Sequence, residues 1–207
     1  MKVVIGIDEC GTGAWAGPIV VACVAVPHDW RPSPLVRDSK AFSGTDAHRR
    51  TEVRQRVLDR HVTPFAQHVA VQSASALDVA TEGHAACWQR MVQTLIDQAR
   101  ALDFEVHRLV VDGAYHPAIT GAEFVVGADR SIPAVSAASM AAKAHRDQQM
   151  LTIERKHPGY GFASHQGYGT AAHRAELGRR GACAEHRLSI AAVRDLDRLA
   201  KLDPVAS

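Results

Sequence analysis

The chain has 207 residues, of which 46% are hydrophobic and 22% are charged, and its formal net charge is +2. This composition is that of a soluble globular protein able to bury one full core, and the small charge neither requires nor excludes a nucleic-acid partner. The apolar run at residues 19–26 is too short to cross a bilayer, and the first residues lack the order of a signal peptide, so we expect a cytoplasmic protein without membrane association.

The turn after the first predicted strand carries the most informative residues. The sequence VVIGIDECGTGAWAGP, residues 3–18, begins with a buried strand and continues into Asp8 and Glu9. Gly11, Gly13 and Gly17 then permit a turn that exposes backbone N–H groups to a phosphate or a sugar hydroxyl. Because neighbouring strand side chains point to opposite faces, the two acids can share one site only if the strand ends or bulges there.

These acids have a simpler interpretation as well, because a single aspartate at a strand end usually caps the strand or forms a turn. A buried strand, two adjacent acids and three glycines occur together here, and unpaired buried carboxylates are costly. The combination therefore favours a site in which a bound cation removes that cost.

The next elements are predicted from apolar spacing and from proline positions. Residues 19–26 are expected to form a second strand that makes a hairpin with the first, and residues 46–61 are expected to form a helix. Residues 65–71 are expected to form a short strand. The polar loop between the hairpin and the helix carries Lys40, which can meet a substrate or an acid of the site; a solvated loop is the alternative.

A clear amphipathic helix is predicted over residues 88–102. Its apolar residues, which include Trp88 and Met91, recur at spacings of three and four and would pack one face of the helix on a sheet. We therefore interpret Trp88 and Met91 as core residues rather than parts of a cofactor site.

Three apolar runs end at acids. Besides the first strand, residues 108–112 end at Asp112 and residues 124–129 end at Asp129. The ends of neighbouring strands in an open α/β sheet meet at one edge, so Asp8, Glu9, Asp112 and Asp129 can converge. Four carboxylates without a histidine or cysteine cluster favour Mg²⁺ or Mn²⁺, and such a site best supports phosphoryl transfer. Individual histidines are interpreted as surface or packing residues.

The remaining charge and cysteine patterns are less specific. The four cysteines show no C-x-x-C pair and predict free thiols in a reducing compartment. Basic residues exceed acidic ones over residues 165–201 and can form either a surface for a phosphate backbone or a solvated helix face. The basic residues are Arg174, Arg179, Arg180, Arg187, Arg194, Arg198 and Lys201.

Five ordered motifs resemble those of bacterial ribonuclease HII. They are DECGTGAWAGP at residues 8–18, DSK at 38–40, VDG at 111–113, GADRSIPAVSAASMAAKAHRD at 127–147 and YGFASHQGYGTAAH at 160–173. The resemblance extends from residue 3 to about residue 194. It implies a ribonuclease H-like α/β fold, in which a mixed five-stranded sheet flanked by helices forms the catalytic domain at residues 1–157. A small helical substrate-binding extension at residues 158–207 would complete one compact unit.

The resemblance also implies an activity. Members of this family are endonucleases that nick the RNA strand of RNA–DNA hybrids and cut 5′ to ribonucleotides embedded in duplex DNA, leaving 3′-hydroxyl and 5′-phosphate ends. In the expected two-metal mechanism, one Mg²⁺ or Mn²⁺ ion activates a water and the other neutralises the departing 3′-oxygen.

Residue by residue, Asp8, Glu9, Asp112 and Asp129 correspond to the four catalytic, metal-binding acids of the family, the same four that the strand ends select. The substrate-binding residues implied by the resemblance are Gly11, Thr12, Gly13, Lys40, Ser136, Ser139, Lys143 and Tyr168. The glycine turn would sense the 2′-hydroxyl, and Tyr168 would pack on the sugar of the next nucleotide; a loop anchor is the alternative for Tyr168. Asp147 also fits the pattern, although a helix salt bridge would explain it equally well.

Three positions depart from the family pattern. Thr12 replaces an arginine, Gln166 replaces a lysine, and Cys10 replaces a small apolar residue. The missing charges weaken the expectation for single embedded ribonucleotides more than the expectation for the metal site. The alternatives are a related nuclease with relaxed specificity and a non-catalytic nucleic-acid-binding module of the same fold. A small-molecule phosphatase has less support, and we expect a monomer.

Overall fold

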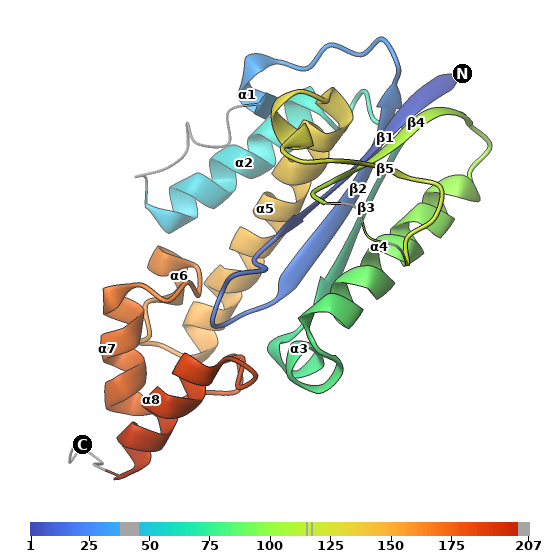
Figure 1. The fold of residues 1–207 in the computed structure, drawn as a ribbon. Helices are drawn as coiled ribbons and strands as arrows, with labels where there is room; N and C mark the ends of the chain where they lie inside the picture. The colour runs from blue at the N-terminus through green and yellow to red at the C-terminus, as the bar shows by residue number, and fades with distance from the viewer. Residues whose placement is uncertain (38–45, 115, 117, 203–207) are drawn as a thin grey trace.

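The core of the fold is a five-stranded mixed β-sheet, seen in a computed structural model that describes residues 1–37, 46–114, 116 and 118–202. The strands are β1 (Lys2–Cys10), β2 (Ile19–Pro27), β3 (His68–Ala74), β4 (Glu105–Asp112) and β5 (Glu123–Val125). Their order across the sheet is β3-β2-β1-β4-β5 (Figure 1). The β1–β2 and β2–β3 pairs are antiparallel, whereas β4 pairs in parallel with both β1 and β5. The predicted hairpin and mixed sheet are confirmed.

Helices cover both faces of this sheet (Figure 1). Helix α4 (His84–Arg100) packs on one face, and α5 (Pro133–Lys156) packs on the other, with α2 (Ala47–His61) against it. Strand β2 is apolar throughout because it faces both layers. Its odd-numbered residues, such as Val21, belong to the cluster under α4, and its even-numbered residues, such as Ala22, belong to the cluster under α5.

Two predicted elements differ in their bounds. Strand β3 begins at His68, three residues later than expected, because residues 62–65 form a turn after α2 and leave Phe65 half exposed. The apolar Phe65 misled the prediction, since its ring contacts Trp30 from the turn, with ring centroids 6.5 Å apart. Helix α4 ends at Arg100, so residue 102 lies beyond it.

Helix α5 lies directly on β1 because Gly6 has no side chain. A Cβ atom at Gly6 would lie 2.2 Å from the carbonyl carbon of Ala134, so any larger residue would push the helix from the strand. Two residues along a strand advance about 6.6 Å, and four residues along a helix advance about 6 Å. Asp8 therefore comes level with Ser139, one helical turn beyond the Gly6 contact.

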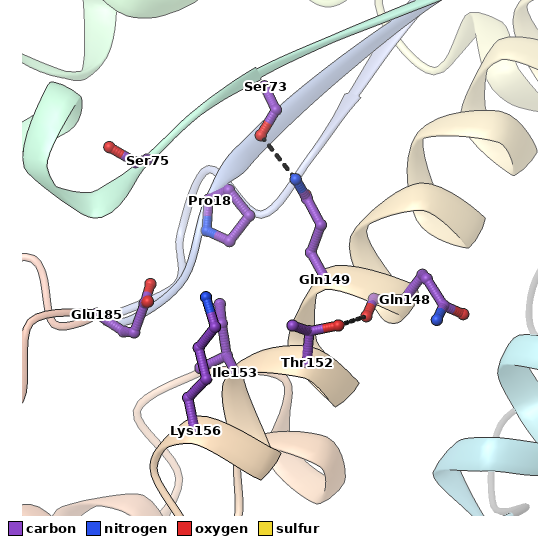
Figure 2. Close-up of a pocket in the computed structure, with 9 residues that line it drawn as sticks. All are labelled: Pro18, Ser73, Ser75, Gln148, Gln149, Thr152, Ile153, Lys156 and Glu185. Atoms are coloured by element: carbon purple, nitrogen blue, oxygen red, sulfur yellow. Dashed lines mark hydrogen bonds between the residues drawn. The ribbon is translucent and has the colours of Figure 1, made fainter.

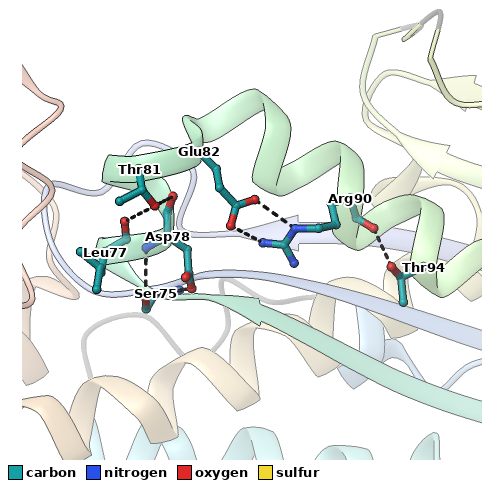
Figure 3. A network of polar contacts seen from close by, with 7 residues as sticks. All are labelled: Ser75, Leu77, Asp78, Thr81, Glu82, Arg90 and Thr94. Atoms are coloured by element: carbon teal, nitrogen blue, oxygen red, sulfur yellow. Dashed lines mark hydrogen bonds and ion pairs between the residues drawn. The ribbon is translucent and has the colours of Figure 1, made fainter.

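The start of α4 is fixed by a network of polar contacts shown in Figure 3. Ser75 and Asp78 form a reciprocal capping box at the start of α3 (Ala76–Glu82), which leads into α4 through Gly83 at φ 88°. Glu82 then accepts two hydrogen bonds from Arg90 of α4, at 3.1 and 3.0 Å. These contacts set the position of the first turns of α4, which carry Trp88.

The remaining helices are shorter. They are α1 (Pro34–Arg37), the 3-10 helix η2 (Ala128–Arg130), α6 (Phe162–His165), α7 (Ala171–Arg180) and α8 (Ala191–Leu202). Helices α6 to α8 gather at the end of the sheet where the β1–β2 turn lies (Figure 1). The turn contacts this group through the Trp15 amide, which donates to Gly167 O at 2.8 Å, and through the Gly17 amide, which donates to Glu185 O at 2.8 Å. The division at residue 157 remains a prediction.

Asp147 has a structural role between helices. Its carboxylate is buried and forms ion pairs with Arg54 and, at 3.6 Å, with Arg50, both from α2. A salt bridge between α2 and α5 therefore explains this acid. The four cysteines are free. In the part of the chain that the structure describes, we find no helix with the length and apolarity that a membrane span requires.

Candidate active site

Asp8 and Glu9 lie on opposite faces of β1, because the strand does not break between them. Asp8 is level with Ala22 and Glu9 with Val21, in a regular pairing that continues to Cys10. Asp8 therefore points toward α5, where the Ser139 hydroxyl binds its carboxylate, and it also accepts a hydrogen bond from the Glu9 amide at 2.8 Å. Glu9 points toward α4 and is hydrogen-bonded by the Trp88 side chain. The strand neither ends nor bulges here, so the condition under which both acids would face one site is not met.

Both carboxyl groups are shielded from water. Asp8 is 5% exposed, and burial raises its pKa to about 6, against the opposing effects of the hydrogen bonds from Ser139 and Glu9 and of the nearby Lys143 ammonium. Burial likewise raises the pKa of Glu9 to about 7, and the negative charges of Asp8 and Asp112 add to that effect. Three of the four predicted acids thus lie near enough to interact electrostatically.

Glu9 and Asp112 face one cavity. The cavity has a volume of about 310 Å³ and is lined by Glu9, Thr12, His84, Ala85, Trp88, Asp112, Gly113, Ala114 and His116. Asp112 is the last residue of β4, which pairs in parallel with β1, so the two acids reach the same edge of the sheet as the topology predicts.

Asp129 lies beyond the end of its strand. Strand β5 ends at Val125, Gly127 turns the chain at φ 71°, and Asp129 sits in η2. The prediction that Asp129 stands at the end of a strand is therefore wrong, because the strand ends four residues before it. The Ala128 amide next to Asp129 donates to the Asp112 carboxylate at 2.7 Å, which places this turn beside the cavity edge. Asp129 itself is not among the residues that line the cavity.

The carboxylates do not form a preassembled metal site. Among the described residues, no three histidine, cysteine or acidic side chains lie in an arrangement that could hold a metal ion. Asp8 and Glu9 are separated by the strand, and Asp112 is held by the Ala128 amide. The donor set still fits a hard cation, because it consists of carboxylate oxygens whose burial disfavours the charged form.

The glycine turn is held by two buried arginines. Gly11 has φ 87°, and a Cβ there would lie 2.2 Å from Nε of Arg146, so only glycine fits. Arg146 donates from Nε to Pro18 O at 3.0 Å, and Arg187 donates from Nη1 to Thr12 O at 3.1 Å and from Nε to Gly17 O at 3.0 Å. Each arginine is 1% exposed. The sequence analysis placed Arg187 on a basic surface, and this assignment is wrong.

Tyr168 lies beside the glycine turn. Its ring is 41% exposed, and the Arg146 guanidinium carbon lies 5.7 Å from the ring centroid. The open space at Gly13 reaches this ring, since an added Cβ would lie 4.0 Å from Cε1 of Tyr168. The structure thus brings together Gly13 and Tyr168, two of the predicted substrate-binding residues, where the glycine turn meets the loop before α7.

The predicted residues of α5 form a chain to Asp8. The Lys143 ammonium donates to the Ser139 hydroxyl at 2.6 Å, and Ser139 is hydrogen-bonded to Asp8. Ser136 is buried, and its hydroxyl donates to Asp129 O at 2.6 Å, so it braces η2. Lys40 lies outside the described residues.

Other basic residues of the C-terminal part are engaged within the protein. Arg179 and Arg180 both donate to Glu176, and Lys201 donates to Asp197. Arg174 stacks on Trp15, with its guanidinium carbon 4.5 Å from the ring centroid. Among the described residues, this surface therefore does not present a continuous row of unengaged cations.

The sequence analysis did not assign six of the nine residues of the cavity wall to the site, and three of these six carry aromatic rings. Trp88 packs against the core, as predicted, but it is only half buried and also binds Glu9. His84 and His116 also line the cavity, and His116 lies 5.4 Å from Trp88 by ring centroids. The spacing of Trp88 in α4 matched that of the core residues. Only its position at the N-terminal end of this apolar stripe could have distinguished it from a residue that serves the core alone.

A second hollow of about 310 Å³ contains none of the predicted residues. Figure 2 shows it between the end of β3, the C-terminal half of α5 and Glu185. Its wall includes a hydrogen bond from Gln149 Nε2 to Ser73 Oγ at 3.1 Å and the charged Lys156. Three of the predicted residues, Glu9, Thr12 and Asp112, line the other cavity instead.

The mixed sheet with its covering helices has the fold of ribonuclease H-like proteins. The ribonuclease H2 structure from Pyrococcus horikoshii OT3 superposes with a TM-score of 0.70 at 17% identity, over 97% of this chain and 100% of that chain. The structure of Bst-RNase HIII in complex with Mn²⁺ gives a TM-score of 0.69 at 16% identity, over 98% of this chain and 71% of that chain. These similarities establish the fold.

Sequence similarity identifies the family. The family model for ribonuclease HII matches residues 5–193. "Ribonuclease HII 2" from Methylibium petroleiphilum is 36% identical over 195 residues, which cover 92% of this chain and 83% of that protein. The chain belongs to the ribonuclease HII family and is a ribonuclease H endonuclease, a hydrolase that acts on nucleic acid.

Proposed function

We propose that this enzyme is a divalent-metal-dependent endonuclease that nicks the RNA strand of RNA–DNA hybrids and cuts 5′ to ribonucleotides embedded in duplex DNA. The products would carry 3′-hydroxyl and 5′-phosphate ends. The observation that carries the proposal is the shared cavity of Glu9, Asp112 and Thr12, which joins two acids to the glycine turn. Residues 1–157 would form the catalytic part and residues 158–207 the substrate-binding part of a monomer.

Asp8, Glu9, Asp112 and Asp129 are the residues that would hold Mg²⁺ or Mn²⁺. Bound there, the cation would supply Lewis acidity toward a phosphodiester and an acidified water. The raised pKa values of Asp8 and Glu9 support this role, because a cation relieves the charge that burial leaves uncompensated. A Mn²⁺ complex of a protein with the same fold is consistent with it.

The other residues of the site would position the substrate. The amides of the Gly11–Gly13 turn would meet the 2′-hydroxyl, which distinguishes RNA from DNA, and the exposed ring of Tyr168 would pack on the neighbouring sugar. Lys143 and Ser139 hold Asp8 in place through their hydrogen-bond chain. The indole of Trp88 does the same for Glu9 from the opposite face.

The test is cleavage of end-labelled duplex DNA with one ribonucleotide, beside an all-DNA duplex and a long RNA–DNA hybrid, in Mg²⁺, Mn²⁺ or chelator. We expect metal-dependent nicking 5′ to the ribonucleotide and no cleavage of DNA alone. Cleavage of the hybrid alone would show that the glycine turn with Thr12 has lost single-ribonucleotide specificity. Binding without cleavage in either metal would favour a non-catalytic module.

A further inference from the structure

The loop that carries Tyr168 rests on two buried histidines. His173 of α7 is 0% exposed and His186 is 3% exposed. Nδ1 of His173 lies 3.0 Å from the Tyr168 carbonyl oxygen, and Nε2 of His173 lies 3.1 Å from Nε2 of His186. Nδ1 of His186 lies 3.0 Å from the Cys183 amide nitrogen.

These contacts determine which nitrogen of each ring carries the proton. A carbonyl oxygen only accepts, so Nδ1 of His173 carries a proton and donates to Tyr168. A backbone amide only donates, so Nδ1 of His186 is the acceptor and its Nε2 carries the proton. The remaining contact then runs from Nε2–H of His186 to the bare Nε2 of His173. Every ring nitrogen has a partner of the correct kind.

This arrangement requires both rings to be neutral, because a proton on either would place two N–H groups against each other. Burial lowers the pKa of each ring to about 4. The titratable groups around the pair are the His165 ring, stacked on His173 at 4.3 Å between centroids, the Tyr160 ring at 5.1 Å from that of His186, the Cys183 thiol at 3.2 Å from His186, and the more distant Asp197 and His157. The pair is therefore neutral in the pH range where the enzyme would act.

The loop backbone that leads into Tyr168 is also fixed. Gly167 O accepts from the Trp15 amide at 2.8 Å, and Gln166 O accepts from Arg146 at 2.9 Å. The contact from His173 falls on the carbonyl of Tyr168 itself, while the ring is left exposed beside the glycine turn. The His173 contact thus acts on the residue of this loop whose ring lies beside Gly13.

We propose that His173 is a positioning residue, whose Nδ1–H bond to the Tyr168 carbonyl holds Tyr168 in its substrate-binding position, while His186 fixes the tautomer of His173 that donates this bond. The proposal rests on the proposed function, in which Tyr168 contacts the sugar of the substrate. Neither histidine touches the substrate; each acts through Tyr168.

Two substitutions of His173 separate its two hydrogen bonds. The amide nitrogen of asparagine takes the place of Nδ1, so His173→Asn keeps the bond to Tyr168 and loses the bond to His186. The amide of glutamine takes the place of Nε2, so His173→Gln keeps the bond to His186 and loses the bond to Tyr168. Both variants lose the buried ring, so a merely structural role predicts the same kinetic behaviour for both.

The kinetic test uses a duplex with one ribonucleotide. We expect His173→Gln to raise KM about fivefold, the size of one net hydrogen bond, with kcat within about twofold of wild type, and His173→Asn to restore KM. In a Tyr168→Ala background, His173→Gln should raise KM no further, because the residue it positions is gone. An equal rise in KM for the asparagine and glutamine variants, or an additive rise in the Tyr168→Ala background, would overturn the proposal.

A second measurement does not depend on activity. Imidazole ¹⁵N NMR of the wild-type protein should show a proton on Nδ1 of His173 and on Nε2 of His186, and His173→Gln should shift the Tyr168 carbonyl ¹³C signal more than His173→Asn does. The opposite tautomers, or equal shifts, would refute the hydrogen-bond chain. If the wild-type protein cleaves no ribonucleotide-containing duplex, the proposed function fails, whereas these spectra still decide whether the pair positions Tyr168.

Discussion

Buried titratable groups lie in two regions of this molecule, and burial affects them in opposite ways. At the sheet edge, burial raises the pKa of Asp8 to about 6 and that of Glu9 to about 7. Above these pH values both acids are charged, which lowers the free energy of unfolding. Under the Tyr168 loop, burial lowers the pKa of His173 and His186 to about 4, and both rings are neutral and fully hydrogen-bonded.

The difference separates a region suited to a ligand from a region suited to support. The acid edge retains negative charge that the protein only partly compensates, which is the condition under which a cation is bound. The histidine pair needs no ligand, because each ring nitrogen already has a protein partner. Substitutions in the two regions should therefore have opposite effects on stability.

The largest expected effect is on cleavage, from Asp112→Asn. The substitution keeps an oxygen that accepts from the Ala128 amide, so the local fold is retained, but it removes a charge from the cavity. Because bound metals supply several kcal/mol to such reactions, we expect cleavage to fall by about 10³-fold or more, with duplex binding largely intact. Single-turnover kinetics measure the cleavage rate, and titration of the duplex measures its binding. Asp103→Asn, an exposed acid in the turn before β4, is the matched control. Near-normal turnover of the Asp112 variant would remove Asp112 from the proposed catalytic set.

The next effect is a gain of stability from Asp8→Asn in the metal-free enzyme. An acid whose folded pKa is raised contributes stability that is fully present below its unfolded pKa, 3.8, and is lost as the pH rises through about 6. At pH 8 the charged form therefore costs about 3 kcal/mol, and Asp8→Asn should recover much of it while abolishing cleavage. Denaturant unfolding at pH 8 and pH 4 measures the difference, which should shrink at pH 4. A variant less stable than wild type at pH 8 would show that the carboxylate is compensated by its own contacts.

Much of the fold could be predicted from the sequence because local patterns determine it. The apolar runs of β1 and β2, the spacing of α2 and α4, and the turn glycines predicted the hairpin and the helices, and the family resemblance implied the mixed sheet. The acids at strand ends pointed to the site edge because parallel strands deliver their ends to one place.

What the sequence could not supply is which layer a side chain faces. Asp8 faces α5 and Glu9 faces α4, and which helix covers which face of β1 depends on tertiary packing. Arg187 looks like any surface arginine in a basic stretch, yet its partner Gly17 is 170 residues away in the chain. His173 and His186 were hidden for the same reason, since their partners belong to loops that only the folded structure brings together.

A moderate effect is expected from the histidine pair when the pH is lowered. A histidine whose folded pKa is depressed contributes stability that is present above its unfolded pKa, 6.5, and is lost as the pH falls through about 4. Each ring changes the free energy of unfolding by up to about 1.4 kcal/mol per pH unit in that window. The stability deficit of His173→Asn relative to wild type should therefore be largest at pH 7 and smaller at pH 4.5.

The comparison of variant with wild type is needed because Asp8 and Glu9 titrate in an overlapping window with the opposite sign. The exposed His107, replaced by glutamine, provides the control and should leave the pH dependence of unfolding unchanged. A deficit for His173→Asn that stays constant from pH 7 to pH 4.5 would show that the buried pair is protonated without loss of its hydrogen bonds.

The smallest effect is expected from Thr12→Arg, which adds a charge between the two regions. Thr12 lines the acid cavity, and its carbonyl is bound by the buried Arg187, so an arginine here would extend toward a phosphate over the turn. Because Arg146 and Arg187 already place positive charge beneath the turn, we expect only a few-fold tighter duplex binding at low salt. The slope of log affinity against log salt should steepen by about 0.9, the value for one added phosphate contact. Thr12→Gln adds length without charge and should change neither quantity; an unchanged salt slope for Thr12→Arg would place this residue away from the nucleic-acid backbone.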